Sequence, residues 1–120
     1  MSRLSGELRQ RTKSYAGAVI RLYCQLPRSR REVEVLGHQL LRSGTSVAAN
    51  TREAARARSS QEFVSKLGIA TQEADESSLW LALLKEDCGI DPEKIDPLLD
   101  ETNQLIAIFT PMSKRTAAAP

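Results

Sequence analysis

The stretch QLLRSGTSVAANTREA, residues 39–54, decides how the rest of this chain folds. Apolar residues keep a helical spacing through it, from Leu36 to Ala54. The tetrapeptide Ser43-Gly44-Thr45-Ser46 interrupts that spacing with four poor helix formers in a row. Small side chains allow another helix to approach closely, and the hydroxyls can bond to carbonyls one turn earlier. We therefore predict a helix that is held by its neighbours, with a kink or local irregularity at Gly44.

Length and composition favour one helical domain over residues 1–120, because a chain of 120 residues can bury one core but not two. Aromatic residues make up only 4% of the chain, which favours helices over sheet. The N-terminus has no apolar signal-peptide core, and no window approaches the roughly 18 apolar residues of a membrane span. A soluble, cytoplasmic protein is therefore expected. Cys24 and Cys88 lie in apolar helical patterns without metal-ligand spacing, so both are expected to be buried free thiols.

Apolar periodicity and capping signals place four amphipathic helices. The clearest seam runs from Phe63 to Cys88 at alternating spacings of four and three, which is typical of coiled-coil-like packing. Capping boxes open the second helix at Ser29 and the third at Ser59. Gly89 is expected to take the left-handed conformation after the third helix.

Two Asp-Pro pairs follow, at residues 91–92 and 96–97, and each is a helix start signal. We interpret residues 91–95 as a single turn and residues 113–120 as a frayed tail. The predicted helices span residues 5–26, 29–57, 60–88 and 97–112. Four such helices with short turns indicate an all-α, antiparallel up-down-up-down four-helix bundle in which the second and third helices are long.

Charge is distributed unevenly along the chain. Residues 1–60 hold 12 Lys and Arg against 4 Asp and Glu, a net charge of +8, whereas residues 61–120 hold 5 against 11, a net charge of −6. Two interpretations follow: a basic face for nucleic acid, or opposite charges that attract copies of the same chain.

No pattern points to catalysis, a metal or a cofactor. The sole histidine, His38, lacks partners at a recognisable spacing, and no P-loop or nucleophile motif is present. Glu73 and Glu76 lie one turn apart, and we interpret them as an exposed acidic face that can bond across to Arg42 or Arg52. The chain is therefore not expected to be an enzyme.

Two further residues have structural interpretations. Asn50 is expected to be buried and to fix the register of the bundle. Trp80 is expected at the edge of the core, and an oligomer interface is the alternative.

Two blocks of sequence resemble the bacterial four-helix bundle proteins encoded in 23S rRNA intervening sequences. The first is LLRSGTSVAAN, residues 40–50, followed by Glu53-Ala54, and the second joins FVSKLGIA, residues 63–70, to EADES, residues 73–77, and to residues 80–85. Ala48 and Asp75 depart from the pattern, where glycine and asparagine are common. The residues that carry the motif are Arg42, Ser43, Gly44, Ser46, Asn50, Glu53, Glu73 and Trp80.

This resemblance implies a ring-shaped homo-oligomer, with a pentamer favoured. It also implies partners, because the related accessory determinant of diversity-generating retroelements binds a reverse transcriptase and nucleic acid. Our first hypothesis is therefore a non-enzymatic module that binds structured RNA or DNA weakly specifically, through phosphates. Its candidate residues are Arg21, Arg28, Arg30, Arg31, Arg52 and Arg56. The alternative is a protein–protein assembly module with no direct role in nucleic-acid binding.

Overall fold

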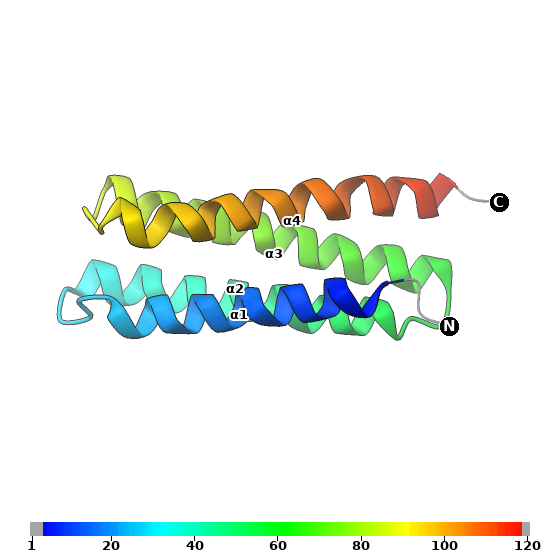
Figure 1. Cartoon of the computed structure of the whole chain (residues 1–120), viewed down its shortest axis with the longest axis horizontal. Coiled ribbons are helices and arrows are strands. Elements are labelled where there is room, and N and C mark those ends of the chain that lie inside the picture. The colour runs from blue at the N-terminus through cyan, green and yellow to red at the C-terminus, as the bar shows by residue number, and fades with distance from the viewer. Residues whose placement is uncertain (1–3, 119–120) are drawn as a thin grey trace.

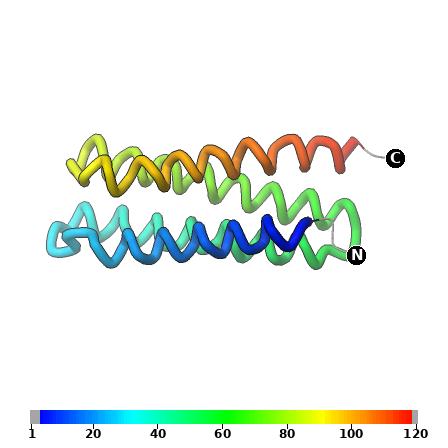
Figure 2. The backbone as a smooth tube through the Cα atoms, viewed as in Figure 1, coloured from blue at the N-terminus to red at the C-terminus, as the bar shows by residue number. Residues whose placement is uncertain are grey.

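Four antiparallel helices form the protein in a computed structural model that describes residues 4–118 (Figure 1). The helices are α1 (Gly6–Gln25), α2 (Arg31–Ala55), α3 (Ser60–Glu86) and α4 (Pro92–Ala118). The hairpin of α1 and α2 lies beside the hairpin of α3 and α4, so that α1 begins and α4 ends at the same end of the bundle (Figure 2). The predicted all-α up-down-up-down bundle is confirmed. Within residues 4–118, no helix has the length and apolar character needed to cross a membrane.

One buried stripe on each helix builds the core. The seam predicted on the third helix lies inside it, because Phe63, Leu67 and Leu81 are almost completely inaccessible to solvent. Packing is most extensive between α2 and α3 and least extensive between α1 and α4. The two central, long helices therefore hold the bundle together, and the junction of α1 with α4 is its most open seam.

Polar contacts bridge this seam between α1 and α4. Arg11 of α1 binds Glu101 of α4 through two nitrogens, with Nε–Oε2 and Nη2–Oε1 distances of 2.8 and 2.6 Å. Further in, the hydroxyls of Tyr15 and Thr102 lie 2.7 Å apart, and burial raises the pKa of Tyr15. Hollows of about 300 and 350 Å³ remain on the seam, one beside Tyr15 and Glu101 and the other beside Arg11.

Helix α2 runs without a break through the tetrapeptide at residues 43–46, so the predicted irregularity at Gly44 is wrong. Close packing explains the continuity. A Cβ atom on Gly44 would lie 2.7 Å from Cγ2 of Val19 on α1. On the α3 side, the Oγ atoms of Ser43 and Ser77 lie 2.7 Å apart. The small residues therefore allow α1 and α3 to approach, as predicted, and these neighbours hold α2 in a regular conformation.

The fourth helix is longer than predicted at both ends. It begins at Pro92, where the carboxylate of Asp91 accepts a hydrogen bond from the N–H of Glu93 at 3.0 Å, and it continues through Pro97 and Pro111. Each proline removes one backbone hydrogen bond. Burial of Ile95 and its neighbours against the core offsets that loss, because packing supplies most of a helix's stability. The single turn at residues 91–95 and the frayed tail up to residue 118 were therefore wrong predictions, and residues 119–120 lie outside the described part.

Of the helix-end features predicted from the sequence, those at Ser59 and Gly89 are confirmed and the one at Ser29 is wrong. Ser59 caps α3, since its Oγ accepts from the N–H of Glu62 at 3.0 Å, and Gly89 has a φ of +71°. Ser29 does not cap α2, because Arg30 takes the N-cap position and its side chain forms no cap bond there. The Arg30 guanidinium instead donates to the carbonyl of Cys88 at 2.9 Å, which joins the two turns at this end of the bundle.

Both cysteines are free thiols, as predicted, but only Cys88 is buried. Cys24 is exposed, which corrects the prediction. It lies two residues after buried Leu22 and two before buried Leu26, so the helical rotation points it away from the core.

Candidate functional site

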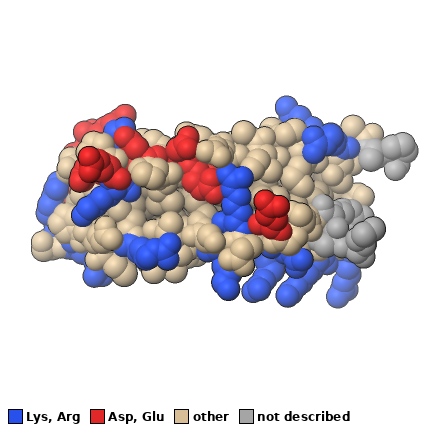
Figure 3. Space-filling view, viewed as in Figure 1, with Lys and Arg blue, Asp and Glu red and all other residues tan. Residues whose placement is uncertain are grey.

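Opposite charges gather in different parts of the surface. Lys and Arg side chains follow the lower right edge in Figure 3, over the first turns of α1, and Asp and Glu side chains cluster at the upper left, where α3 ends and α4 begins. The charge asymmetry of the sequence is therefore also an asymmetry of the folded surface.

A hollow of about 330 Å³ lies between the first turns of α1 and the last turns of α2. Three cations surround it: Arg9 and Lys13, one turn apart on α1, and Arg52 on α2. Its remaining lining residues, mostly small, are Gly6, Gln10, Ala48 and Ala49. We call this feature the basic hollow. Small residues leave its floor open, and the three long cationic side chains line it from both helices.

The three cations have no carboxylate partners among residues 4–118, although six ion pairs form elsewhere in this range. Glu53, the residue after Arg52, instead lies 3.5 Å from Lys66 of α3. Gly6, the first residue of α1, brings the positive end of that helix to the hollow. The hollow therefore combines three unneutralised cations with a favourable helix terminus.

The six arginines predicted to bind nucleic acid lie in different parts of the structure. Arg52 lines the hollow, and exposed Arg56 follows one turn later at the end of α2. Arg21 lies further along α1, and its guanidinium lies beside Gly17, where a Cβ atom would meet Nη1 at 3.2 Å. The other three candidates, Arg28, Arg30 and Arg31, lie at the opposite end of the bundle. Helix α1 has 20 residues, so about 30 Å separates the two ends of this helix.

Two of the arginines at that opposite end have structural partners. Arg28 lies over the ring of Tyr23, 4.8 Å from its centroid, and a hydrogen bond with Tyr23 is the main cause that raises the pKa of Arg28. Arg30 binds the turn between α3 and α4, which carries Asp87 and Asp91. These acids offset the positive potential there. The predicted set is therefore not one surface.

Arg9 and Lys13 are binding candidates that the sequence analysis missed. Their spacing of four residues places them on one face of α1, and that signal was present in the sequence. What the sequence did not supply is the register of α1 against α2, which sets them opposite Ala48, Ala49 and Arg52.

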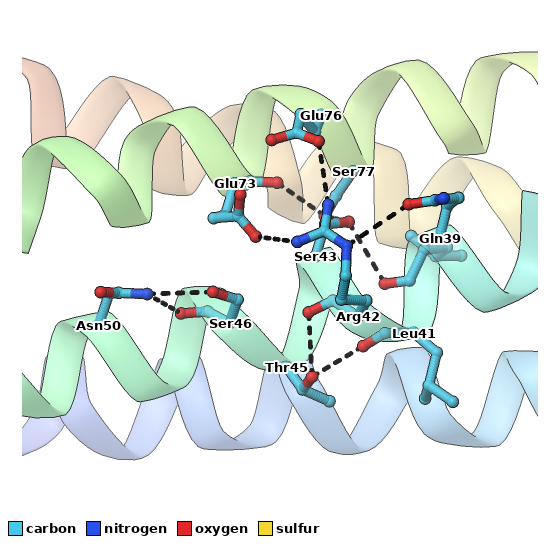
Figure 4. Close-up of polar contacts among 11 residues, drawn as sticks. Gln39, Leu41, Arg42, Ser43, Thr45, Ser46, Asn50, Glu73, Glu76 and Ser77 are labelled. Carbon is cyan, nitrogen blue, oxygen red and sulfur yellow. Dashed lines mark hydrogen bonds and ion pairs between the residues drawn. The ribbon is translucent and has the colours of Figure 1, made fainter.

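The motif residues in the middle of α2 have different surroundings. Arg42 lies between two carboxylates of α3 and donates from Nη1 to Glu73 at 2.9 Å and from Nη2 to Glu76 at 3.0 Å (Figure 4). The predicted cross-helix bond to Arg42 is thus confirmed. The neighbouring Glu73, through a hydrogen bond, is the main cause that raises the pKa of Glu76. Arg42 therefore neutralises two crowded acids and serves the α2–α3 junction.

Three other motif residues also have packing roles. Asn50 is buried, but its Nδ2 donates to the carbonyl and the Oγ of Ser46, at 2.9 and 3.0 Å, within α2. Its predicted role in fixing the register is therefore not supported by a bond to another helix. The hydroxyl contacts between Ser43 and Ser77 and between Tyr15 and Thr102 do cross between helices. Trp80 is half-buried against the core, and its indole N–H has no acceptor in the described part of the chain.

Together, the fold and these sites define a helical bundle with an open basic hollow and a centre held by cross-helix hydrogen bonds. Residues 4–118 contain no group of three His, Cys, Asp or Glu residues able to hold a metal. The family model of the 23S rRNA-intervening sequence protein matches residues 6–110. The chain belongs to this family, as its sequence motifs predicted.

A solved structure supports the assignment. The crystal structure of a protein with unknown function from the S23 ribosomal protein family of Bacteroides thetaiotaomicron VPI-5482 is 32% identical, with a TM-score of 0.81. The match covers 88% of this chain and 97% of that one. No curated protein matches the chain. Neither the family nor the solved structure indicates an enzymatic activity.

Proposed function

We propose that this chain is a non-enzymatic module that binds RNA or DNA through backbone phosphates at the basic hollow. The observation that carries the proposal is that Arg9, Lys13 and Arg52, from two helices, line one hollow and have no carboxylate partner among the described residues. Unpaired cations around an open hollow attract anions without first having to break an ion pair. The hollow's lining contains no aromatic residue, so binding does not depend on stacked bases.

A salt series tests this proposal. Labelled hairpin RNA and duplex DNA are titrated with the purified chain, and fluorescence anisotropy gives the affinity. The three cations displace counterions from the nucleic acid, so the logarithm of the association constant falls against the logarithm of salt concentration with a slope of about −2 to −3. An absence of binding at low salt contradicts the proposal.

A matched pair of variants locates the site. Arg52→Glu reverses a charge at the hollow, and Arg31→Glu reverses one at the opposite end of the same helix. Each lost charge-assisted hydrogen bond weakens binding about tenfold or more, so we expect that loss from Arg52→Glu. Arg31→Glu should change the affinity by less than about threefold, because its contribution is only long-range and screened. Equal losses from both variants would place the binding surface elsewhere.

Self-association is a second candidate, favoured by exposed apolar side chains on α3. Among residues 4–118, four large apolar side chains are exposed, and two of them, Ile69 and Leu79, lie on this helix. A second copy would bury these side chains, and its basic edge would attract the acidic end of α3 and α4. We propose a homo-oligomer, with a pentamer favoured by the family resemblance. The reverse transcriptase partner implied by that resemblance stays a prediction.

Light scattering across a salt series tests this assembly. We expect an oligomer that loosens at high salt. Leu79→Glu should shift the population towards monomer, whereas Asn103→Glu, at an exposed position on α4 instead of α3, should leave it unchanged. A wild-type monomer at every salt concentration contradicts self-association.

A further inference from the structure

The size of the basic hollow limits what can enter it. Its volume of about 330 Å³ lies at the lower end of the range for small-molecule sites, which begins near 300 Å³. A group about as large as one nucleotide can occupy this space. A double helix cannot enter it, and only a protruding part of a nucleic acid can reach its floor of Gly6, Ala48 and Ala49.

The charge of the hollow exceeds what one internal phosphate requires. An internal phosphodiester carries a single negative charge and has two free oxygens. A phosphomonoester carries a charge of about −1.5 to −2 at neutral pH and presents three acceptor oxygens. Arg9, Lys13 and Arg52, which line the hollow, supply three separate cationic donor groups, as many as a phosphomonoester has acceptor oxygens.

The positions of the donors suit a group that enters from the open side. Arg9 and Lys13 stand one turn apart on α1, and Arg52 faces them from α2. The guanidinium of Arg9 lies back over the first turn of α1. A Cβ atom added to Gly6 would lie 3.8 Å from Nη2 of Arg9. That position adds its charge to the positive end of the helix. Donors thus surround the space from both helices.

We propose that the basic hollow binds the terminal phosphate of a nucleic-acid strand, in preference to its internal phosphates. This inference rests on the proposed function and names the part of the nucleic acid that the site recognises. The recognised chemistry is a phosphomonoester dianion joined to a strand. Internal phosphates next to the end would contact the exposed Arg56, one turn beyond Arg52.

Oligonucleotides that differ only at their ends test this inference. One 12-nucleotide RNA sequence is prepared with a 5′-phosphate, with a 3′-phosphate and with hydroxyls at both ends, and each is labelled at an internal base. Anisotropy titrations at neutral pH then compare the three. We expect at least one phosphorylated form to bind about tenfold more tightly than the hydroxyl form.

Variants assign that preference to the hollow. Arg9→Gln and Arg52→Gln should each abolish it, and Arg31→Gln should preserve it. Ala49→Leu fills the hollow without changing its charge and should also remove the preference, while circular dichroism shows that the variant keeps its helices. A preference that survives all three substitutions at the hollow overturns the assignment.

The remaining outcomes separate the two proposals. Equal affinities for the three oligonucleotides, still weakened by Arg52→Glu, overturn terminal recognition and leave general phosphate binding intact. No binding of any oligonucleotide overturns both. Adenosine monophosphate serves as a competitor, and a mononucleotide that binds as tightly as the phosphorylated strand shows that the site takes free nucleotides, which also overturns the inference.

Discussion

The middle of α2 and its last turns, both within the stretch at residues 39–54, have opposite surroundings. At residues 42–44, every polar side chain has a hydrogen-bond partner, and Gly44 packs so closely against α1 that a Cβ atom would clash with Val19. At residues 48–52, the α1-facing side chains are small or cationic, and they leave a hollow open to solvent. The comparison teaches that one helix can divide its roles between neighbouring turns. The closed part of α2 specifies the bundle, and its open part is available to a ligand.

Filling the closed part should have the largest effect. Gly44→Val would place a branched side chain where even a Cβ atom lies 2.7 Å from Val19. Because α1 must shift, we expect a loss of about 3 kcal/mol or more in the free energy of unfolding, measured by urea denaturation. Gly68→Ala is the control, since nothing lies within 4 Å of its added Cβ, and it should stabilise the helix by up to about 1 kcal/mol. Equal effects at both glycines would refute the close approach.

Removing the buried hydroxyls of Ser43 and Ser77 tests the polar contact between α2 and α3 beside Gly44. The two Oγ atoms lie 2.7 Å apart, and each hydroxyl also has a carbonyl acceptor in its own helix, Leu40 for Ser43 and Glu73 for Ser77. Ser43→Ala and Ser77→Ala should each cost about 1–2 kcal/mol, and the double variant should cost less than their sum. On the open part, Ala49→Ser should change stability by less than about 0.5 kcal/mol. Strict additivity of the serine variants would show that the two hydroxyls do not interact.

Two arginines of one helix allow a direct contrast. Arg42→Gln leaves Glu73, whose side chain is only 12% exposed, beside Glu76 without a cation, and we expect a loss of about 1 kcal/mol. Arg52→Gln removes no ion pair and should stay within about 0.5 kcal/mol of the wild type. Thermal unfolding at low ionic strength measures both. The contrast fails if Arg52→Gln costs as much stability as Arg42→Gln.

The pH dependence of the closed part should be the smallest effect. The pKa of Glu76 lies above the ordinary value of 4.5, chiefly because of its hydrogen bond with Glu73. Between pH 4.5 and the folded pKa, the carboxyl group of Glu76 is protonated in the folded state but ionised in the unfolded state. Its contribution to the free energy of unfolding is therefore full below pH 4.5 and is lost as the pH rises through the folded pKa. Because 43% of the Glu76 side chain is exposed and solvent screens its interactions, the change is roughly a few tenths of a kcal/mol.

The variant Glu76→Gln removes this titrating group. The stability difference between wild type and Glu76→Gln should therefore shift in favour of the wild type as the pH is lowered from 7 to below the ordinary value of 4.5. Urea denaturation at several pH values measures the difference, and a shift in the opposite direction would contradict the assignment of the raised pKa.

The sequence predicted the fold because periodicity is a property of each helix by itself. The seam from Phe63 to Cys88, the cap at Ser59 and the turn at Gly89 all depend on residues close together in the chain. The errors arose where tertiary packing overrides local preference. The pair Asp96-Pro97 is a local start signal, yet α4 already begins at Pro92, because Ile95 is buried against the core.

The basic hollow could be predicted only in part for a related reason. Arg52 followed from charge counting, but Arg9 and Lys13 face it only because of the helix register. Charge counting also placed Arg28 and Arg30 in the same set, although aromatic and carbonyl partners occupy their guanidiniums. A sequence gives the sign of each side chain's charge, whereas the fold determines which charged side chains already have a partner.

The open seam between α1 and α4 has a consequence for amide hydrogen exchange. Because α1 contacts α4 so little, α1 is the helix whose separation from the bundle disrupts the fewest contacts. Its amides should therefore exchange faster than those of α2 and α3. Arg9 and Lys13 belong to α1 and Arg52 to α2, so an anion bound among them ties the two helices together and slows that exchange. At a ligand concentration of 100 times Kd, this linkage adds about 2.7 kcal/mol to the free energy of opening.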